Sequence, residues 1–484
     1  MHSLFILLIL LLSGTACSVP LYGMPGEAAP CVAGSSSATP YYIDNIDSLA
    51  HDSICADTVA LTLREKLDSI LSDDMLQTSQ IGFVAYDLTA DTLLYARNEH
   101  QTMRPASTMK LLTAIAALDR LGGSYRYSTM LKADGSVYVG ADGDKTSRTL
   151  AGRLVVVGGM DPMFGSDDMR AFVESLQREH IDTIYGEVVA DMSFKEPALL
   201  GEGWCWDDDN PVLTPLPWNR KDNFMQKFRS LLDDAGIAIL SPEAFQSQTD
   251  TVFTLASDTL ADMAQPAFMH IVEKQFSNAV LSTRYHTIEQ VLVRMMKRSD
   301  NLYAESLFYH LAAAQQRPAT AKRAAHQVVR LLQKIGVSHK NYRIADGSGL
   351  SLYNYLTPDM LMRMLRYAYR NPNIYEYLYP SLPIAGVDGT LQKRMLTAPC
   401  KGNVRGKTGT LTGISSLAGY LTAANGNTVC YVIINQGVMR AATAKAMQDR
   451  LCQALCEYKA ESEPANPNEK EEMRKKEGER RCKD

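Results

Sequence analysis

Ser107 and Lys110 have the S-x-x-K spacing, which occurs nowhere else in the chain. On a helix this spacing puts both side chains on one face, so the lysine amine can reach the serine hydroxyl. A serine is a weak nucleophile without a nearby base, and a lysine is such a base only when burial, a helix N-terminus or a second cation lowers its pKa. The pair therefore indicates attack of a serine on a carbonyl group. A helix cap followed by a solvated lysine would give the same pattern.

A second short motif, Ser299-Asp300-Asn301, lies between two predicted helices. A hydroxyl and an amide two residues apart can both face a cleft from a short turn. There the hydroxyl can pass on a proton and the amide can hold a substrate carbonyl. The structural alternative is an N-cap for the helix that follows.

A third motif, Lys407-Thr408-Gly409-Thr410, begins a strand-like region. A cation together with a hydroxyl suits a terminal carboxylate. Gly409 permits close approach of the backbone to a substrate. The structural alternative is a strand edge with Lys407 in solvent.

The three motifs follow one another in the order that penicillin-binding proteins and class A β-lactamases share. The chain resembles the class C low-molecular-mass penicillin-binding proteins, the D-alanyl-D-alanine carboxypeptidases/endopeptidases, over residues 60–458. Almost two hundred residues separate Ser107 from Ser299 and no E-x-x-L-N stretch is present, which is unlike a class A β-lactamase. Further segments carry the resemblance: Arg104–Ser107, Gly159–Pro162, Gly203–Asp208, Asp346–Ser351, Gly386–Leu391 and Val404–Leu421.

This resemblance implies the roles of the motif residues. Ser107 would attack the D-Ala-D-Ala carbonyl with Lys110 as the general base. Ser299, helped by Lys407, would pass the proton to the leaving amine. Asn301 would bind the peptide backbone and orient Lys110. No cofactor and no metal are implied, and the expected ligands are peptidoglycan peptides and, as covalent inhibitors, β-lactams.

The resemblance also implies a substrate-binding set. The backbone N–H groups of Ser107 and Thr410 would form the oxyanion hole, while Thr408, Thr410 and Lys407 would hold the substrate carboxylate beside Gly409. Asp161 could meet the amino group of a diamino acid in the stem peptide, although Met160 departs from the small residue usual before it. An Asp-Pro turn is the structural alternative for Asp161.

The elements that must position these residues follow from periodicity. Apolar stripes and caps predict helices, and β-branched and aromatic runs predict strands. The Trp204–Trp206 loop is interpreted as local core, and residues 346–351 as an ordered loop that shapes the cleft. The predicted helices span 57–71, 104–121, 169–179, 287–296, 301–313, 321–335, 360–369 and 441–458, with strands at 81–86, 92–95, 153–157, 186–190, 413–421 and 428–435.

The fold class expected from the resemblance is α/β (α+β), a β-lactamase/transpeptidase-like antiparallel sheet with helices. Residues 58–124 and 283–458 would form the catalytic domain, and 125–282 a large α/β insertion domain. An apolar run from Leu4 to Leu12 predicts a signal peptide over 1–16, so the protein is expected in the periplasm or cell envelope. Cys17 allows lipid anchoring as an alternative to ordinary cleavage. Residues 17–57 are predicted as a linker and 459–484 as a charged disordered tail.

Composition narrows the function classes. The formal net charge of -5 shows no basic excess, which argues against a nucleic-acid partner. The nine cysteines include no C-x-x-C pair and HExxH is absent, which argues against a zinc site. Two rival functions are a β-lactamase on the same scaffold and a catalytically silent envelope scaffold protein. Carboxypeptidase and endopeptidase activity both fit the sequence.

Overall fold

The computed structural model describes residues 61–142, 145–240, 271–338 and 340–459. The predicted signal peptide with Cys17, the linker and all but the first residue of the predicted tail lie outside this range. The described residues all belong to one compact unit. The domain boundaries at 125 and 282 therefore stay a prediction. Two five-stranded sheets organise the described residues.

The first sheet joins strands from both ends of the described chain. Its order is β2-β1-β10-β9-β8, and every neighbouring pair is antiparallel. The K-T-G motif lies on β8 at one edge of this sheet, and β2 lies at the other edge. After β2 the chain reaches the turn Ala106–Thr108, which contacts β8 and β9, so the S-x-x-K motif lies beside the K-T-G motif. The strands are β1 (Gln80–Asp87), β2 (Thr92–Arg97), β8 (Arg405–Leu411), β9 (Ile414–Thr422) and β10 (Thr428–Gln436).

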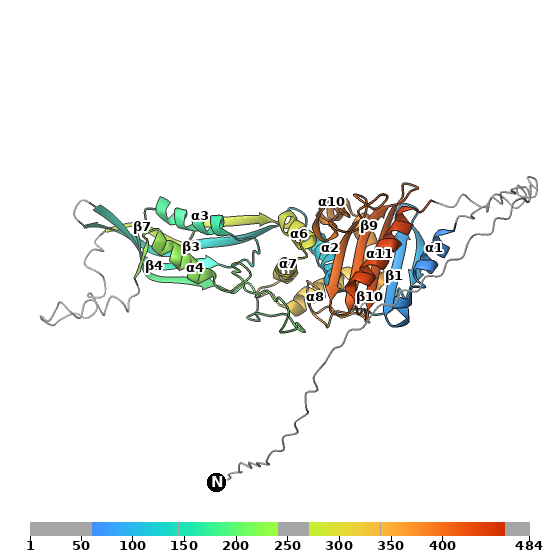
Figure 1. The fold of residues 1–484 in the computed structure, drawn as a ribbon. Coiled ribbons are helices and arrows are strands. Elements are labelled where there is room, and N and C mark those ends of the chain that lie inside the picture. Colours follow the sequence, from blue (N-terminus) through green and yellow to red (C-terminus); the bar gives the residue numbers. More distant parts are fainter. Residues whose placement is uncertain (1–60, 143–144, 241–270, 339, 460–484) are drawn as a thin grey trace, which may run out of the picture. The chain divides into compact units, whose positions relative to one another are not determined.

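Side chains of β10 alternate between two apolar cores because successive residues of a strand point to opposite faces. Tyr431 and Ile433 pack with α1 (Leu63–Ile70) and α11 (Ala441–Cys456). Val432 and Ile434 pack on the other face with α2 (Met109–Leu121) and α9 (Pro358–Tyr369). Helices therefore cover both faces of the first sheet, and α11 crosses one of them in Figure 1.

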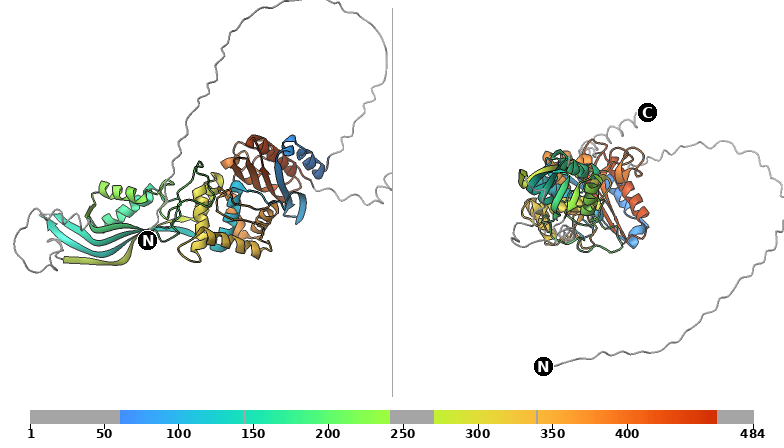
Figure 2. Two further views of the ribbon diagram at one scale, coloured as in Figure 1. Left: turned by 90° about the horizontal axis from the view of Figure 1, so that it is seen from below. Right: turned by 90° about the vertical axis from the view of Figure 1, so that its left-hand side faces the viewer.

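The second sheet has the order β6-β5-β4-β3-β7. The β4–β5 and β5–β6 pairs are parallel and the other two pairs are antiparallel. Two helices, α3 (Ser166–Arg178) and α4 (Phe224–Asp234), cover one face of it (Figure 2) and complete an aromatic core. The strands are β3 (Arg126–Asp142), β4 (Lys145–Val157), β5 (Thr183–Asp191), β6 (Ala238–Leu240) and β7 (Ile271–Thr287).

Helix α7 is unusual because every residue from Leu302 to Ala312 is buried. It packs against α2, α6 and α8, so it runs through the middle of the helical layer. A helix buried on all sides is a rigid support for side chains at its first turn. The remaining elements are α6 (Ile288–Lys297), α7 (Asn301–Ala313), α8 (Ala321–Lys334), α10 (Pro372–Ser381) and the 3-10 turns Asp74–Gln77, Ala106–Thr108 and Gly389–Leu391.

Most of the predicted elements are found within a few residues, but two predictions were wrong. The helix expected from Arg104 begins only at Met109, after a 3-10 turn in which Ala106 has a φ of 49°. Trp206, expected in a local core, is 93% exposed, while its neighbour Trp204 is half-buried. The helices α4 and Pro372–Ser381 and the long strands β3 and β7 were not predicted.

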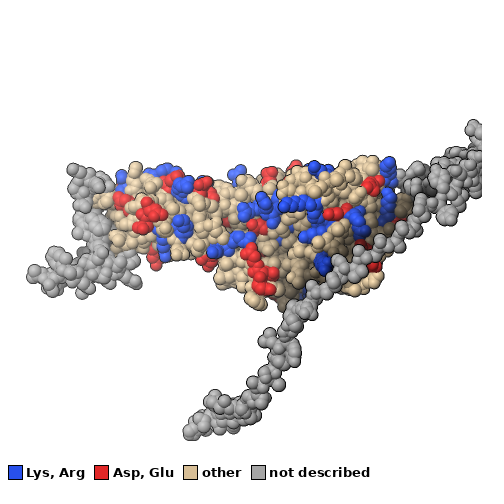
Figure 3. Space-filling view, viewed as in Figure 1, with Lys and Arg blue, Asp and Glu red and all other residues tan. Residues whose placement is uncertain are grey.

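Basic and acidic side chains are interspersed on the face shown in Figure 3, in line with the small net charge. Of the helices in the described residues, none has the length and apolar character that a membrane crossing needs.

Candidate active site

Ser107 lies in a fixed turn at the start of α2. The Pro105 carbonyl accepts hydrogen bonds from the hydroxyls of Thr108 (2.7 Å) and Ser416 (2.6 Å), which tie this turn to β9. The positive φ of Ala106 is uncommon for a residue with a side chain and needs such support. Ser107 remains partly exposed, as a nucleophile must be.

The amine of Lys110 is fully buried and has three partners. Its Nζ lies 2.9 Å from Ser107 Oγ, 2.7 Å from Asn301 Oδ1 and 2.8 Å from the Ser348 carbonyl oxygen. The three partners come from the 3-10 turn before α2, from α7 and from the loop after α8. Segments distant in the sequence therefore meet at one amine, as expected.

The electrostatics of Lys110 favour a base. Burial lowers the pKa of Lys110 to about 8, although the carboxylates of Asp346, Glu305 and Asp300 oppose that shift. At this value an appreciable fraction of the amine is neutral near physiological pH, whereas an ordinary lysine is almost wholly charged.

A second buried lysine, Lys407, contacts the hydroxyl of Ser299. Lys407 Nζ donates to Ser299 Oγ at 2.7 Å and to the Thr408 carbonyl at 2.7 Å. Burial first, and then the charge of Lys110, hold the pKa of Lys407 well below its ordinary range. The site therefore contains two amine–hydroxyl pairs.

Each residue of the Ser299-Asp300-Asn301 turn has a different role. Asp300 is the N-cap of α7 and accepts from the Leu302 backbone N–H at 3.1 Å. Ser299 adopts a positive φ of 58° and Asn301 is the first helical residue, so their side chains reach Lys407 and Lys110. The predicted N-cap thus exists, but on Asp300, which leaves Ser299 and Asn301 for the site.

Gly409 lets β8 approach the nucleophile turn. A Cβ at this position would lie 2.9 Å from the Ser107 nitrogen and 2.2 Å from Ser416 Oγ, so a larger residue would push the strand away. Thr408 Oγ1 donates to Thr390 Oγ1 at 2.8 Å, and Thr410 is exposed. Lys407 therefore contacts Ser299 and Gly409 lies against the Ser107 turn, whereas the Thr408 side chain contacts Thr390.

An open pocket of about 570 Å³ lies beside these groups, and Ser299, Asn301 and Thr410 all border it. Leu350 and Leu411 add apolar surface to its wall. Beyond the bridge between Arg405 and Ile384, the outer edge of β8 has no strand partner among the described residues. An extended peptide could therefore lie along β8 with its carbonyl near Ser107.

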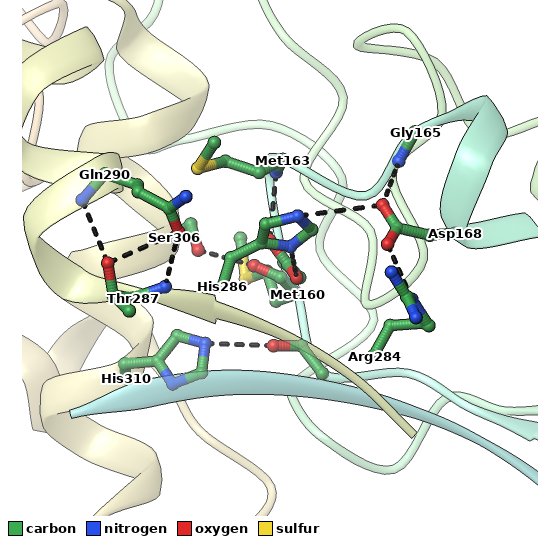
Figure 4. Close-up of polar contacts among 12 residues, drawn as sticks. Met160, Met163, Gly165, Asp168, Arg284, His286, Thr287, Gln290, Ser306 and His310 are labelled. Atoms are coloured by element: carbon green, nitrogen blue, oxygen red, sulfur yellow. Dashed lines mark hydrogen bonds and ion pairs between the residues drawn. The ribbon is translucent and has the colours of Figure 1, made fainter. Parts of the chain in front are cut away.

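Asp161 does not reach this pocket as a free carboxylate. Its side chain is fully buried, with Oδ2 2.6 Å from His286 Nδ1 and Oδ1 accepting from the Met163 backbone N–H at 2.9 Å. Figure 4 shows His286 between the Met160 segment and Asp168. The Asp161 hydrogen bond raises the pKa of His286. These contacts favour the structural alternative, a turn next to a strand end.

Two contributors to the site were missed by the sequence analysis. The Ser348 carbonyl that contacts Lys110 is a backbone atom, so its role could not be predicted from a residue type. Glu305 carries a buried carboxylate behind the same loop. A single acidic residue inside the apolar run of α7 was the signal that could have found it. Among the described residues, no His, Cys, Asp and Glu side chains gather as a metal site would require.

Comparisons with known proteins agree with this geometry. The D-alanyl-D-alanine carboxypeptidase DacB of Haemophilus influenzae is 28% identical over 424 residues, which cover 75% of this chain and 87% of that protein. The D-alanyl-D-alanine carboxypeptidase of Actinomadura sp. (strain R39) is 27% identical over 473 residues, covering 83% of this chain and 86% of that protein. The crystal structure of penicillin binding protein 4 (dacB) from Haemophilus influenzae matches with a TM-score of 0.65 at 23% identity, covering 80% of this chain and 99% of that one. The predicted fold class is thereby confirmed.

The family model described as the D-Ala-D-Ala carboxypeptidase 3 (S13) family matches residues 63–217 and 268–458, well over half of the chain. The match includes all three motifs and every strand of the two sheets except β6. The protein therefore belongs to the D-Ala-D-Ala carboxypeptidase 3 (S13) family of peptidases.

Proposed function

We propose that the protein cleaves the D-Ala-D-Ala end of peptidoglycan stem peptides through an acyl-enzyme on Ser107. The observation that carries this proposal is the 2.9 Å contact between Ser107 Oγ and the buried Lys110 amine. Family membership supports the same reaction class. A neutral Lys110 takes the hydroxyl proton while Ser107 Oγ attacks the carbonyl carbon.

The second amine–hydroxyl pair completes acylation. As the C–N bond breaks, Ser299 gives its proton to the leaving amine and regains one from Lys407, 2.7 Å away. The backbone N–H groups of Ser107 and Thr410 are the proposed oxyanion hole, where removing one donor typically costs about 2.7–4 kcal/mol of barrier stabilisation. Water then adds to the ester carbonyl and gives a proton to Ser299, which passes one back to Lys407. The Ser107 oxygen leaves with a proton returned from Lys110.

The substrate carboxylate is assigned to Lys407, Thr408 and Thr410, and the peptide backbone to Asn301. The exposure of Thr410 and the open edge of β8 support this placement. Asp161 is left out of the binding set, because its carboxylate is buried against His286. β-Lactams are proposed as covalent ligands of the same serine.

We place the protein in the bacterial cell envelope, where its proposed substrate lies. Lipid attachment at Cys17 stays a prediction from the sequence. Carboxypeptidase and endopeptidase action share the acyl-enzyme and differ in the leaving group, which is free D-alanine in the first and a cross-linked peptide in the second. Digesting linear and cross-linked muropeptides side by side, with chromatography of the products, assigns the activity.

The experiment that tests the proposal is incubation with benzylpenicillin followed by mass spectrometry of the intact protein and its peptides. We expect a stable adduct on the peptide that contains Ser107 and none in Ser107→Ala. Rapid turnover of penicillin without a persistent adduct would favour a β-lactamase. Absence of both labelling and hydrolysis, in a folded protein, would contradict the mechanism and favour a silent scaffold.

A further inference from the structure

Glu305 is a buried carboxylate that the proposed reaction does not use. It lies on α7, one turn after Asn301, and its side chain is enclosed by the core. Burial raises its pKa to about 8. A buried carboxylate in a helix of apolar residues is costly unless it makes specific hydrogen bonds.

Those hydrogen bonds go to the loop that contacts the base. Glu305 Oε1 accepts from the Ser348 backbone N–H at 2.7 Å and from the Gly347 N–H at 3.1 Å. The carbonyl oxygen of the same Ser348 accepts from Lys110 at 2.8 Å. Ser348 therefore donates its backbone N–H to Glu305 and accepts a hydrogen bond from the Lys110 amine through its carbonyl.

The rest of the loop is tied down in the same way. Asp346 accepts from the backbone N–H groups of Gly349 (2.8 Å) and Ser351 (2.7 Å), and Thr113 Oγ1 donates to the Gly347 carbonyl at 2.7 Å. A Cβ on Gly349 would lie 1.9 Å from the Ala106 carbonyl oxygen. The loop therefore packs directly on the nucleophile turn.

The chemistry of a neutral amine makes this support important. Neutral Lys110 has two N–H donors and one lone pair. The Asn301 Oδ1 and Ser348 carbonyl oxygens are both acceptors, so they take the two N–H bonds. The lone pair is then left to face the Ser107 hydroxyl. If the Ser348 carbonyl shifted, the amine could rotate and its lone pair would leave Ser107.

We propose that Glu305 is a positioning residue for acylation, which holds the Ser348 carbonyl so that the Lys110 lone pair points at Ser107. This inference rests on the proposed function of Ser107 and Lys110. The charged groups that face Lys110 are Asp346 on the loop, Glu305 on α7, Asp300 at the α7 cap and Lys407 on β8. The first three stabilise the ammonium form of Lys110, and Lys407 is the like-charged neighbour.

The test measures the acylation rate constant and the dissociation constant of benzylpenicillin separately, across pH. Glu305→Gln keeps one acceptor but loses the negative charge. We expect its acylation rate constant to fall about tenfold or more, a part of the 10²–10⁴-fold effect of a general base. The dissociation constant should not change. Because the pKa of Glu305 is about 8, its negative charge acts on Lys110 mainly in alkaline solution, so the pH profiles of Glu305→Gln and the wild type should differ most there.

Glu305→Leu, which loses both acceptors, should acylate more slowly than Glu305→Gln. Thr113→Val removes a second tether of the same loop and should give a smaller loss in the same direction, so it decides the matter if the Glu305 variants do not fold. Glu196→Gln is the matched control. Its carboxylate also accepts from a backbone N–H, that of Ala321 at 2.8 Å, and from the Tyr309 hydroxyl at 3.2 Å, but none of its hydrogen bonds goes to the 346–351 loop.

Folded Glu305 variants that acylate at the wild-type rate with the wild-type pH profile would overturn the inference. So would a loss matched by Glu196→Gln, because that loss would reflect stability alone. These outcomes are distinct from failure of the proposed function, in which the wild-type protein itself would not be labelled on Ser107.

Discussion

The two sheets of this protein have cores of different chemistry. The core of the second sheet is made of apolar side chains, with Phe172 and Phe228 packed from α3 and α4 onto Leu150 and Leu154 of β4 and its neighbours. The region beside the first sheet buries charge instead, on Lys110, Lys407, Glu305 and Asp346. Buried charge costs stability, whereas apolar packing adds to it. The comparison indicates that the buried charges of the site lie outside the apolar core that α3 and α4 form on the second sheet.

The largest expected effect tests the charged region. Lys110→Ala should slow acylation of Ser107 by benzylpenicillin by about 10²–10⁴-fold, because the general base is lost. Time-resolved mass spectrometry of the labelled protein measures the rate. Circular dichroism should show that the fold is retained.

The control for this variant is Lys322→Ala, which removes an exposed lysine on α8 and should acylate normally. Near-normal acylation by Lys110→Ala would place the base elsewhere. It would also remove the functional reason for burying that charge.

The second prediction concerns the apolar region. Phe172→Ala should lower the free energy of unfolding by about 3–5 kcal/mol, because it leaves a cavity in a packed core. Acylation per folded molecule should not change. Denaturant unfolding and labelling stoichiometry measure the two quantities.

Phe308→Ala sharpens the same comparison. Phe308 is buried on α7 and packs against Gly347, so its loss should reduce both stability and acylation. If Phe172→Ala also reduced acylation per folded molecule, the apolar core of the second sheet would not be separable from the catalytic region beside the first sheet.

Sequence patterns identified the catalytic residues better than the groups that position them. Spacing on a helix was enough to pair Ser107 with Lys110, and the order of the motifs implied that Ser299 and Lys407 join them. The Ser348 carbonyl escaped because backbone atoms carry no residue signal. The 3-10 turn at Ala106 escaped because its cause is a tertiary contact, the Ser416 hydroxyl on the Pro105 carbonyl. Trp206 was misplaced because composition does not reveal which face of a loop is covered.

The smallest effect is expected where the two regions meet. Asp161→Asn should lower the free energy of unfolding by about 1–3 kcal/mol through the weakened bond to His286, with unchanged acylation. The pKa of His286 is raised in the folded protein from its ordinary 6.5. The stability from this pair is therefore complete below pH 6.5 and is lost as the pH rises through the folded-state pKa.

Thermal unfolding of the wild type and Asp161→Asn across pH should show a gap that is widest in acid and narrows toward alkaline pH. A gap that widened with pH would contradict this account. A change in stem-peptide kinetics would return Asp161 to the substrate-binding set.

The residues after β4 also fasten the second sheet to α7. Ser306 Oγ donates to the Met160 carbonyl at 2.5 Å, and His310 Nε2 lies 2.9 Å from the Gly159 carbonyl. Both side chains are buried, so without these carbonyls the Ser306 hydroxyl and the Nε2 atom of His310 would lose their partners inside the helix that begins with Asn301. A shortened enzyme lacking residues 126–287 would therefore need new partners, or apolar replacements, at Ser306 and His310. Shortening this peptidase would therefore require changes in α7 as well as a new connection between residues 125 and 288.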